Sequence, residues 1–249
     1  MQQLTLFSNT STRQTRHSAN KKVRKGARQV QPSAHWELWS QENESEKELV
    51  LFFLDIRNFT PLAEKHQAFD VIHIVKKLFS TFQNIIRIHH GRIIETSGDG
   101  FYAAFGFDCD VREAVNASVK AGMTILKTLE NLNKQSFEKN LHQRIDIGMG
   151  IHVGSVATGS LSIGSKDHLI VMGYPVNVAS RLQAATKELN NNFLVSSDVF
   201  KQLDSVDTTP PCVTTYLKGV TTPLEIYLLG KAYFNPAFTS CLNRCDKKH

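Results

Sequence analysis

The stretch ELVLFFLDI, residues 48–56, most constrains how this chain can fold. A continuous apolar run of this length that ends in an acid is typical of a central strand buried on both faces of a sheet. The run is far shorter than the roughly 20 apolar residues that a membrane-spanning helix needs. We therefore expect a sheet-based domain whose first strand is this segment.

The segments after this strand alternate between the helical and the strand period. Residues 59–90 carry apolar side chains at helical spacings, Phe69 and Ile72 among them, until Gly91 ends the run. The later segments predict, in order, strands 92–96 and 101–107, a helix 112–132, a strand 144–154, an apolar segment 168–173, a helix 176–189 and a hairpin 214–230. This order predicts an α+β fold with a ferredoxin-like βαββαβ core and an additional C-terminal helix and strands.

The positive charge of the chain is concentrated before this domain. Residues 1–36 contain seven Lys and Arg and no Asp or Glu, so the remaining residues carry a net charge of −1 although the whole chain carries +6. The composition predicts a disordered basic tail over 1–46, a folded domain over 47–231 and a second tail over 232–249. The run KKVRKGAR, residues 21–28, could form a weak electrostatic contact with an anionic membrane or nucleic acid, or serve only as a solvated leader.

Targeting signals and cysteine spacing add little to this description. The first thirty residues are polar and do not resemble a secretory signal, and no apolar run is long enough for a transmembrane segment, so we expect a cytoplasmic protein. The four cysteines do not have the spacing of a zinc site and are interpreted as free thiols. They are Cys109, Cys212, Cys241 and Cys245.

Two carboxylates stand at turns that the predicted fold brings together. Asp55 ends the first strand just before a predicted helix begins, and Asp99 lies in the turn between the next two strands. In a ferredoxin-like sheet these two places are neighbours. A helix N-terminus favours phosphate, and two converging carboxylates can hold one or two Mg²⁺ ions against a nucleoside triphosphate. Each Asp taken alone could equally be a strand-end or turn residue.

Five segments of the chain carry a family resemblance. They are FLDIRNFTPLAE (53–64), GRIIETSGDGFYAAF (91–105), GMGIHVGSVATGSLSIG (148–164), VMGYPVNVASRLQAA (171–185) and YLKGVTTPLEIYLL (216–229). They resemble the consecutive signature segments of the class III nucleotide cyclase catalytic domain, in the family order and over roughly residues 47–231. The resemblance implies the fold of that family and an adenylate or guanylate cyclase that makes a cyclic nucleotide messenger.

The resemblance also implies a metal and phosphate site. Asp55 and Asp99 match the metal-binding aspartates, and the backbone carbonyl of Ile56 would complete the coordination of two Mg²⁺ or Mn²⁺ ions per active site. The segment that follows, with Phe59 and Thr60, would cradle the phosphates of the substrate. Either Asp55 or a water molecule on the metal could take the proton of the 3′-hydroxyl.

Three further positions match residues that contact the substrate in the family. Asn177 and Arg181 match the pair that orients the ribose and stabilises the reacting α-phosphate, and their i, i+4 spacing places them on one helix face. Lys218 matches the lysine that contacts the triphosphate. In this family each active site lies between two catalytic domains, one of which holds the metals while the other contacts the base and the transition state, so the resemblance implies a homodimer with two equivalent sites.

The residues that would contact the base leave the substrate open between ATP and GTP. Glu95 matches the acid that guanylate cyclases carry, and a carboxylate suits the N1–H and amino group of guanine. Ile170 matches neither the adenylate nor the guanylate cyclase pattern and can hydrogen-bond to neither base. A relaxed or pyrimidine-tolerant pocket is a third interpretation.

Two other classes of function stay open beside the enzyme. One is a catalytically inactive cyclase-like module that senses nucleotides or dimerises. The other is a nucleic-acid-binding protein that uses the basic tail on a ferredoxin-like sheet. Such sheets expose stacking aromatic residues on their central strands, whereas we expect Phe52, Phe53 and Phe101 to be buried.

Overall fold

The structure is a computed structural model that describes residues 44–163, 166–204 and 209–233. The basic run 21–28 and most of both predicted tails lie outside these residues. Within them, no helix combines the length and the apolar character that crossing a membrane requires. Cys109 and Cys212 are free thiols, as expected, whereas Cys241 and Cys245 lie outside the described ranges.

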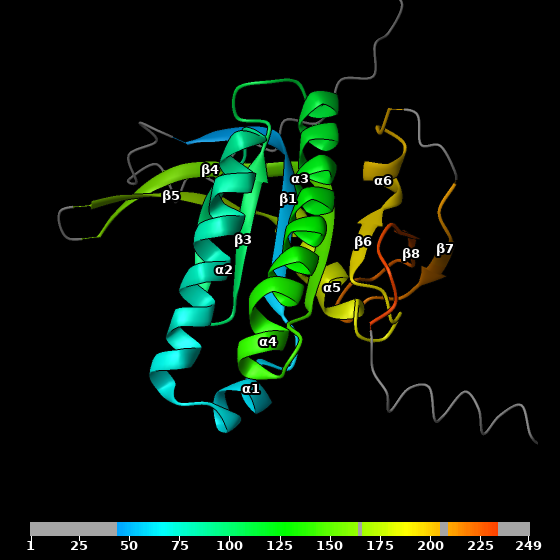
Figure 1. Ribbon diagram of the computed structural model, residues 1–249. Coiled ribbons are helices and arrows are strands. Elements are labelled where there is room, and N and C mark those ends of the chain that lie inside the picture. The colour runs from blue at the N-terminus through cyan, green and yellow to red at the C-terminus, as the bar shows by residue number, and fades with distance from the viewer. Residues whose placement is uncertain (1–43, 164–165, 205–208, 234–249) are drawn as a thin grey trace, which may run out of the picture. The chain divides into compact units, whose positions relative to one another are not determined.

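The α+β prediction is confirmed, and most elements begin and end near the predicted residues (Figure 1). α5 ends earlier than predicted, at Ala185, and turns occupy the residues up to 190. The elements are β1 (Ser45–Ile56), α1 (Phe59–Lys65), α2 (Ala68–Ile88), β2 (Arg92–Ser97), β3 (Gly100–Phe105), α3 (Val111–Leu132), a π-helical turn (Asn133–Phe137), α4 (Glu138–Leu141), β4 (Ile147–Ile163), β5 (Lys166–Met172), α5 (Tyr174–Ala185), β6 (Phe193–Ser196), α6 (Ser197–Phe200), β7 (Cys212–Thr215) and β8 (Leu224–Leu228).

One sheet runs through the domain in the order β2-β3-β1-β4-β6-β8-β7, with β5 paired to β4. β1 is antiparallel to both β3 and β4, and Asp55 at its end lies opposite Gly100 on one side and Gly148 on the other. The strands β2-β3-β1-β4 with their connecting helices form the predicted ferredoxin-like core. β6 adds to β4 in parallel, and the hairpin β7-β8 closes the sheet.

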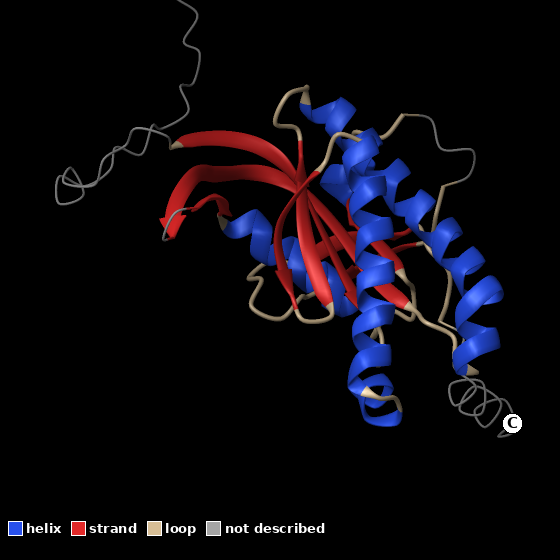
Figure 2. Ribbon diagram, turned by 60° about the vertical axis from the view of Figure 1, so that its left-hand side comes forward, coloured by secondary structure: helices blue, strands red, loops and turns tan. Residues whose placement is uncertain are grey.

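Helices cover both faces of this sheet. α2 and α3 lie over one face, where they bury Phe82 and Ile125 against Phe52 and Phe105 of the strands (Figure 1). α5 lies on the opposite face, where Ala179 packs in a cluster with residues of β1, β3 and β4 (Figure 2). Because successive side chains of a strand alternate between faces, the part of a strand that is covered on both sides must be apolar, as β1 is from Leu49 to Leu54.

The predicted helix over residues 59–90 is two helices. His66 and Gln67 have extended backbone angles, which end α1 and allow α2 to begin in a new direction. Phe69 and Ile72, two of the apolar residues that recur at helical spacings, are 82% and 47% exposed. The buried stripe of α2 instead starts at Val71 and continues through Ile74, and Phe69 and Ile72 lie off this stripe.

β4 extends well beyond the predicted end at residue 154. Its first half pairs with β1 as far as the pair Ser45–Thr158, and its second half pairs with β5. The two strands form an arm that projects from the sheet (Figures 1 and 2). Leu161 and Leu169 on this arm, and Met172 at the C-terminal end of β5, are exposed apolar side chains.

Gly150 allows α5 to lie directly on β4. A Cβ at this position would lie 2.8 Å from the carbonyl carbon of Leu182 and 2.9 Å from the carbonyl oxygen of Ala179. Both atoms belong to the backbone of α5, so no side-chain rotation can relieve the contact. The glycine therefore sets the distance between the helix and the strand.

We predict that Gly150→Ala lowers the free energy of unfolding by about 1–3 kcal/mol, because overpacking a rigid contact displaces backbone. Denaturant-induced unfolding measures the change. Gly159→Ala is the matched control on the same strand, since its nearest contact would be the Cγ atom of Glu44 at 3.5 Å. Equal unfolding midpoints for the two variants would contradict the prediction.

Candidate active site

A cavity of about 590 Å³ opens where β1 ends, between the β2-β3 turn and α5. Four of the residues singled out in the sequence line it: Asp55, Glu95, Asp99 and Asn177. They come from four different elements or turns, so only the folded sheet brings them together. This cavity is the candidate active site.

The pairing of β1 with β3 places Asp55 and Asp99 side by side. The backbone N–H of Ile56 donates to the carbonyl oxygen of Asp99 at 3.0 Å, which ties the turn to the end of β1. Gly98 in this turn has a φ of 57°, in the left-handed region that glycine adopts without strain. The predicted convergence of the two carboxylates is thus present in the backbone geometry.

The two carboxylates repel each other in a partly desolvated place. Burial raises the pKa of Asp55 above its ordinary value, and the negative charge of Asp99 raises this pKa further. The positive charges of Arg57 and Lys187 oppose the shift. A cation between the carboxylates would remove the repulsion, so the pair suits a divalent metal ion.

The donor set suits Mg²⁺ or Mn²⁺ because it consists of hard oxygen atoms. Within the described ranges, no group of three or more His, Cys, Asp or Glu side chains converges in a way that could hold a metal ion. A metal at Asp55 and Asp99 would therefore need backbone oxygen, water or phosphate as further ligands. The predicted carbonyl of Ile56 is one such donor.

Arg57 is a functional candidate that the sequence analysis missed. Its side chain is buried, with Nη1 3.6 Å from Oδ2 of Asp55 and Nη2 donating to the carbonyl oxygen of Gln183 at 3.2 Å. Gly148 leaves the space that the guanidinium fills, because a Cβ there would collide with Arg57 and Thr186. The one available signal was the position of Arg57 two residues after Asp55.

The aromatic wall of the cavity was also missed. Tyr102 and Phe53 stack with ring centroids 4.9 Å apart and an interplanar angle of 7°, and both line the cavity. Phe53 is only half-buried, so the expectation that it is buried was wrong, whereas Phe52 and Phe101 are buried as expected. Phe53 reaches the cavity because it lies on the α5 face of β1 near the end of the strand.

The remaining predicted residues do not line the cavity. Arg181 is exposed on α5, and Lys218 is exposed between β7 and β8. Ile170 is half-buried on β5, and Phe59 and Thr60 begin α1. One chain as described here therefore assembles only part of the predicted set around the carboxylates.

The start of α1 leaves its backbone N–H groups without a capping side chain. Asn58 precedes the helix with a φ of 55° and makes no side-chain capping hydrogen bond. Uncapped N–H groups at a helix start are available to an anion. This geometry is compatible with the predicted phosphate cradle at Phe59 and Thr60.

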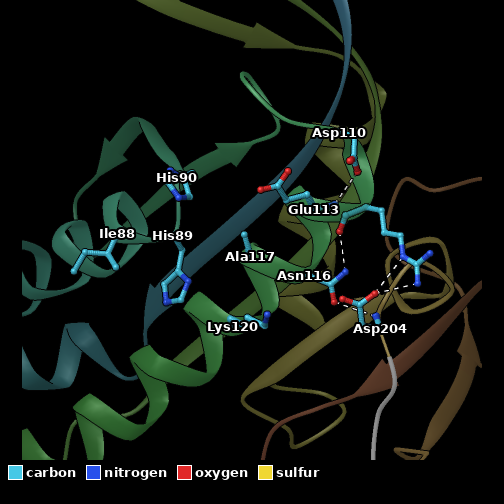
Figure 3. Close-up of a pocket in the computed structure, with 10 residues that line it drawn as sticks. Ile88, His89, His90, Asp110, Glu113, Asn116, Ala117, Lys120 and Asp204 are labelled. Atoms are coloured by element: carbon cyan, nitrogen blue, oxygen red, sulfur yellow. Dashed lines mark hydrogen bonds and ion pairs between the residues drawn. The ribbon is translucent and has the colours of Figure 1, made fainter.

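A second cavity, of about 450 Å³, lies between the end of α2 and the first half of α3 (Figure 3). No residue of the predicted site lines it. Arg112 and Asp204 form an ion pair at 3.0 Å there, and Asn116 donates to the carbonyl oxygen of Arg112 at 2.9 Å. Because several of its polar groups already bind one another, this cavity is a weaker candidate for the chemistry.

Comparisons with known proteins match most of the chain. The family model described as the adenylate and guanylate cyclase catalytic domain matches residues 41–230. Adenylate cyclase 1 of Rhizobium meliloti is 30% identical over 184 residues, which cover 73% of this chain. The chain spans 27% of the length of that relative, and 31% and 21% of the lengths of two further adenylate cyclases, from Anabaena cylindrica and Dictyostelium discoideum.

Solved structures share the fold. The guanylyl cyclase Cya2 superposes with a TM-score of 0.68 at 22% identity, covering 78% of this chain and 97% of the other. The adenylyl cyclase CyaB from P. aeruginosa superposes with a TM-score of 0.67 at 24% identity, covering 77% of this chain and 97% of the other. At these identities the structural likeness establishes the fold alone.

We predict opposite shifts in the pKa of Asp55 when its two charged neighbours are removed. Asp99→Asn removes the like charge and lowers the pKa of Asp55, whereas Arg57→Met removes the opposite charge and raises it. Carboxyl ¹³C NMR titration without divalent metal measures both shifts. Asp108→Asn is the control, since Asp108 pairs with Arg92 and is not among the charges that shift Asp55. Shifts in the same direction would contradict the assigned electrostatics.

Proposed function

The chain belongs to the adenylate and guanylate cyclase catalytic domain family, and we propose that it converts a nucleoside triphosphate to the 3′,5′-cyclic monophosphate and pyrophosphate for second-messenger signalling. The observation that carries the proposal is the pair of half-buried carboxylates, Asp55 and Asp99, in one cavity with Glu95 and Asn177. A structural role for this pair would not require two acids whose like charges repel each other.

The proposed site would hold two Mg²⁺ or Mn²⁺ ions through Asp55, Asp99 and the carbonyl of Ile56. When bound, these ions would offset phosphate charge and make the 3′-hydroxyl of the ribose more acidic. Arg57 would hold the carboxylate of Asp55 in place through their ion pair. The hydrogen bond from Arg57 to the carbonyl oxygen of Gln183 would in turn position the guanidinium. The start of α1, at Phe59 and Thr60, would bind the phosphates through backbone N–H groups.

The reaction is an in-line attack of the ribose 3′-oxygen on the α-phosphorus, which expels pyrophosphate and closes the ring. It needs no covalent intermediate with the protein, so positioning and charge stabilisation supply the rate enhancement. Asn177 would orient the ribose, and Arg181 would meet the charge that develops on the α-phosphoryl oxygens. Lys218 would bind the triphosphate as a cation.

We propose that two copies of the chain complete each site. Arg181 and Lys218 do not line the cavity of Asp55 and Asp99 in one chain, although all four residues are present. The arm of β4 and β5 offers exposed apolar residues, Leu161 and Leu169, for contact with a second copy. A two-fold dimer would then contain two equivalent sites.

The base pocket favours GTP in this proposal. Glu95 is exposed and lines the cavity, where its carboxylate can accept from the N1–H and amino group of guanine. Ile170 does not line the cavity and has no polar atom on its side chain to offer either base. Glu95 is therefore the first determinant of base selectivity.

The direct test of the proposed function is incubation of the purified full chain with ATP, GTP, CTP and UTP, each with Mg²⁺ or Mn²⁺. We expect a 3′,5′-cyclic product, with GTP preferred. Asp99→Asn should lower turnover about 100-fold or more, because it removes half of the acidic pair. Absence of a cyclic product from a folded, dimeric protein would instead favour an inactive nucleotide-sensing or dimerisation module.

We predict that two inactive variants restore activity when mixed. Asp55→Ala and Arg181→Ala should each lose nearly all turnover alone, and their equimolar mixture should recover about a quarter of wild-type activity. Half of the dimers would be mixed, and each of these would contain one site with both residues intact. Activity of the mixture no higher than that of either variant would argue against the shared site.

A mixture of Asp55→Ala with Asp99→Ala is the matched control. Both residues would come from the same copy at each site, so no mixed dimer would gain a complete site. Dilution of the wild type below the dimer dissociation constant should also reduce turnover per chain. Turnover per chain that is independent of concentration would argue against the dimer.

A further inference from the structure

The base end of the cavity contains a polar group to which the family resemblance assigns no role. Tyr102 lies on β3 directly opposite Glu95 on β2, in the pairing register of the two strands. Both residues line the same cavity, together with Val171 of β5. Side chains of opposed residues in an antiparallel pair lie on one face of the sheet, about 5 Å apart at Cβ.

The ring of Tyr102 is held in place, whereas its hydroxyl group can exchange partners. The ring is stacked on Phe53 at 4.9 Å, which restricts its position. The hydroxyl donates to the backbone carbonyl of Val171 at 3.2 Å. This distance exceeds the usual 2.5–3.0 Å range of an O–H···O bond, so the interaction is weak and a better acceptor could replace it.

The hydroxyl of Tyr102 remains a donor at neutral pH. Burial raises the pKa of Tyr102 above its usual 10.0, and the negative charge of Glu95 raises it further. Glu95 as a carboxylate can only accept hydrogen bonds. The cavity therefore presents an acceptor and a donor on neighbouring strands.

This combination is complementary to the edge of guanine. That edge carries the O6 acceptor beside the N1–H and N2 amino donors, whereas adenine presents an amino donor beside an unprotonated ring nitrogen. Glu95 can accept from N1–H and the amino group, which leaves O6 in need of a donor. Ile170, the neighbour of Val171, has no donor in its side chain and does not line the cavity.

We propose that Tyr102 is a specificity-determining residue, whose hydroxyl leaves the carbonyl of Val171 and donates to O6 of a guanine base that Glu95 holds by N1–H and the amino group. The inference rests on the proposed function and specifies GTP as its substrate. It assigns the donation of a hydrogen bond to O6 to a side chain of β3, because Ile170 on β5 has no donor.

The test compares kcat/KM for GTP and ATP in the wild type and in Tyr102→Phe, which keeps the stacked ring and removes only the hydroxyl. We expect Tyr102→Phe to lower the GTP-to-ATP ratio about 5- to 10-fold, because one neutral hydrogen bond to the base is lost. Inosine triphosphate, which keeps O6 and N1–H but lacks the amino group, should lose the same factor as GTP.

Tyr227→Phe is the matched control, because Tyr227 stacks on Phe200 at 3.8 Å and does not line the cavity. This variant should leave the ratio unchanged. A wild type that prefers ATP, or a Tyr102→Phe variant that slows both nucleotides equally, would overturn the inference and leave the cyclase activity standing.

Calorimetry of GTP and ATP binding to the wild type, Tyr102→Phe and Tyr227→Phe distinguishes failure of the inference from failure of the proposed function. If the wild type forms no cyclic product, the proposed function fails. Guanine recognition by Tyr102 is then still supported if Tyr102→Phe weakens GTP binding 5- to 10-fold more than ATP binding. It falls if both dissociation constants change by the same factor, or if neither nucleotide binds.

Discussion

The site depends on the antiparallel pairing of β1 with β3 and β4 at once. This pairing sets Asp55 between Gly100 and Gly148, so that the end of the strand is enclosed by backbone on both sides. A Cβ at Gly100 would lie 2.8 Å from the carbonyl oxygen of Leu54 and 3.3 Å from the carboxylate of Asp55. Gly100 therefore leaves the space for Asp55, and Gly148 leaves the space for Arg57.

This enclosure accounts for the electrostatics of the site. Asp55 lies in a partly desolvated place beside a like charge from the β2-β3 turn, and Arg57 provides incomplete compensation from the protein side. The remaining charge of the two acids is negative and faces the cavity. A divalent cation bound there would neutralise it and could also bind a polyphosphate. Arg181 and Lys218, the groups proposed to act on the substrate from a second copy, are exposed in the single chain.

The sequence pattern predicts a site residue where the position of that residue depends on its neighbours in the chain or on a recognisable turn. Asp55 was found because it ends a buried apolar run, and Asp99 because it lies in a glycine-flanked turn between two strands. Phe69 and Ile72 follow the helical spacing and are nevertheless exposed, because helical spacing defines a stripe but does not say which of two overlapping stripes faces the sheet. Tyr102 was overlooked because its partners, Glu95 and Val171, belong to other strands.

The sequence by itself determined the order of strands and helices, the family, and the identity of the acids at the end of β1, because these follow from local periodicity and from contiguous motifs. Only the tertiary structure decided which side chains share the cavity and which charges Asp55 experiences. It also decided that β4 leaves the sheet as an arm with β5. The physical reason is that burial, like-charge repulsion and cross-strand contact join residues distant in sequence, and the register of β1 with β3 and β4 sets their distances.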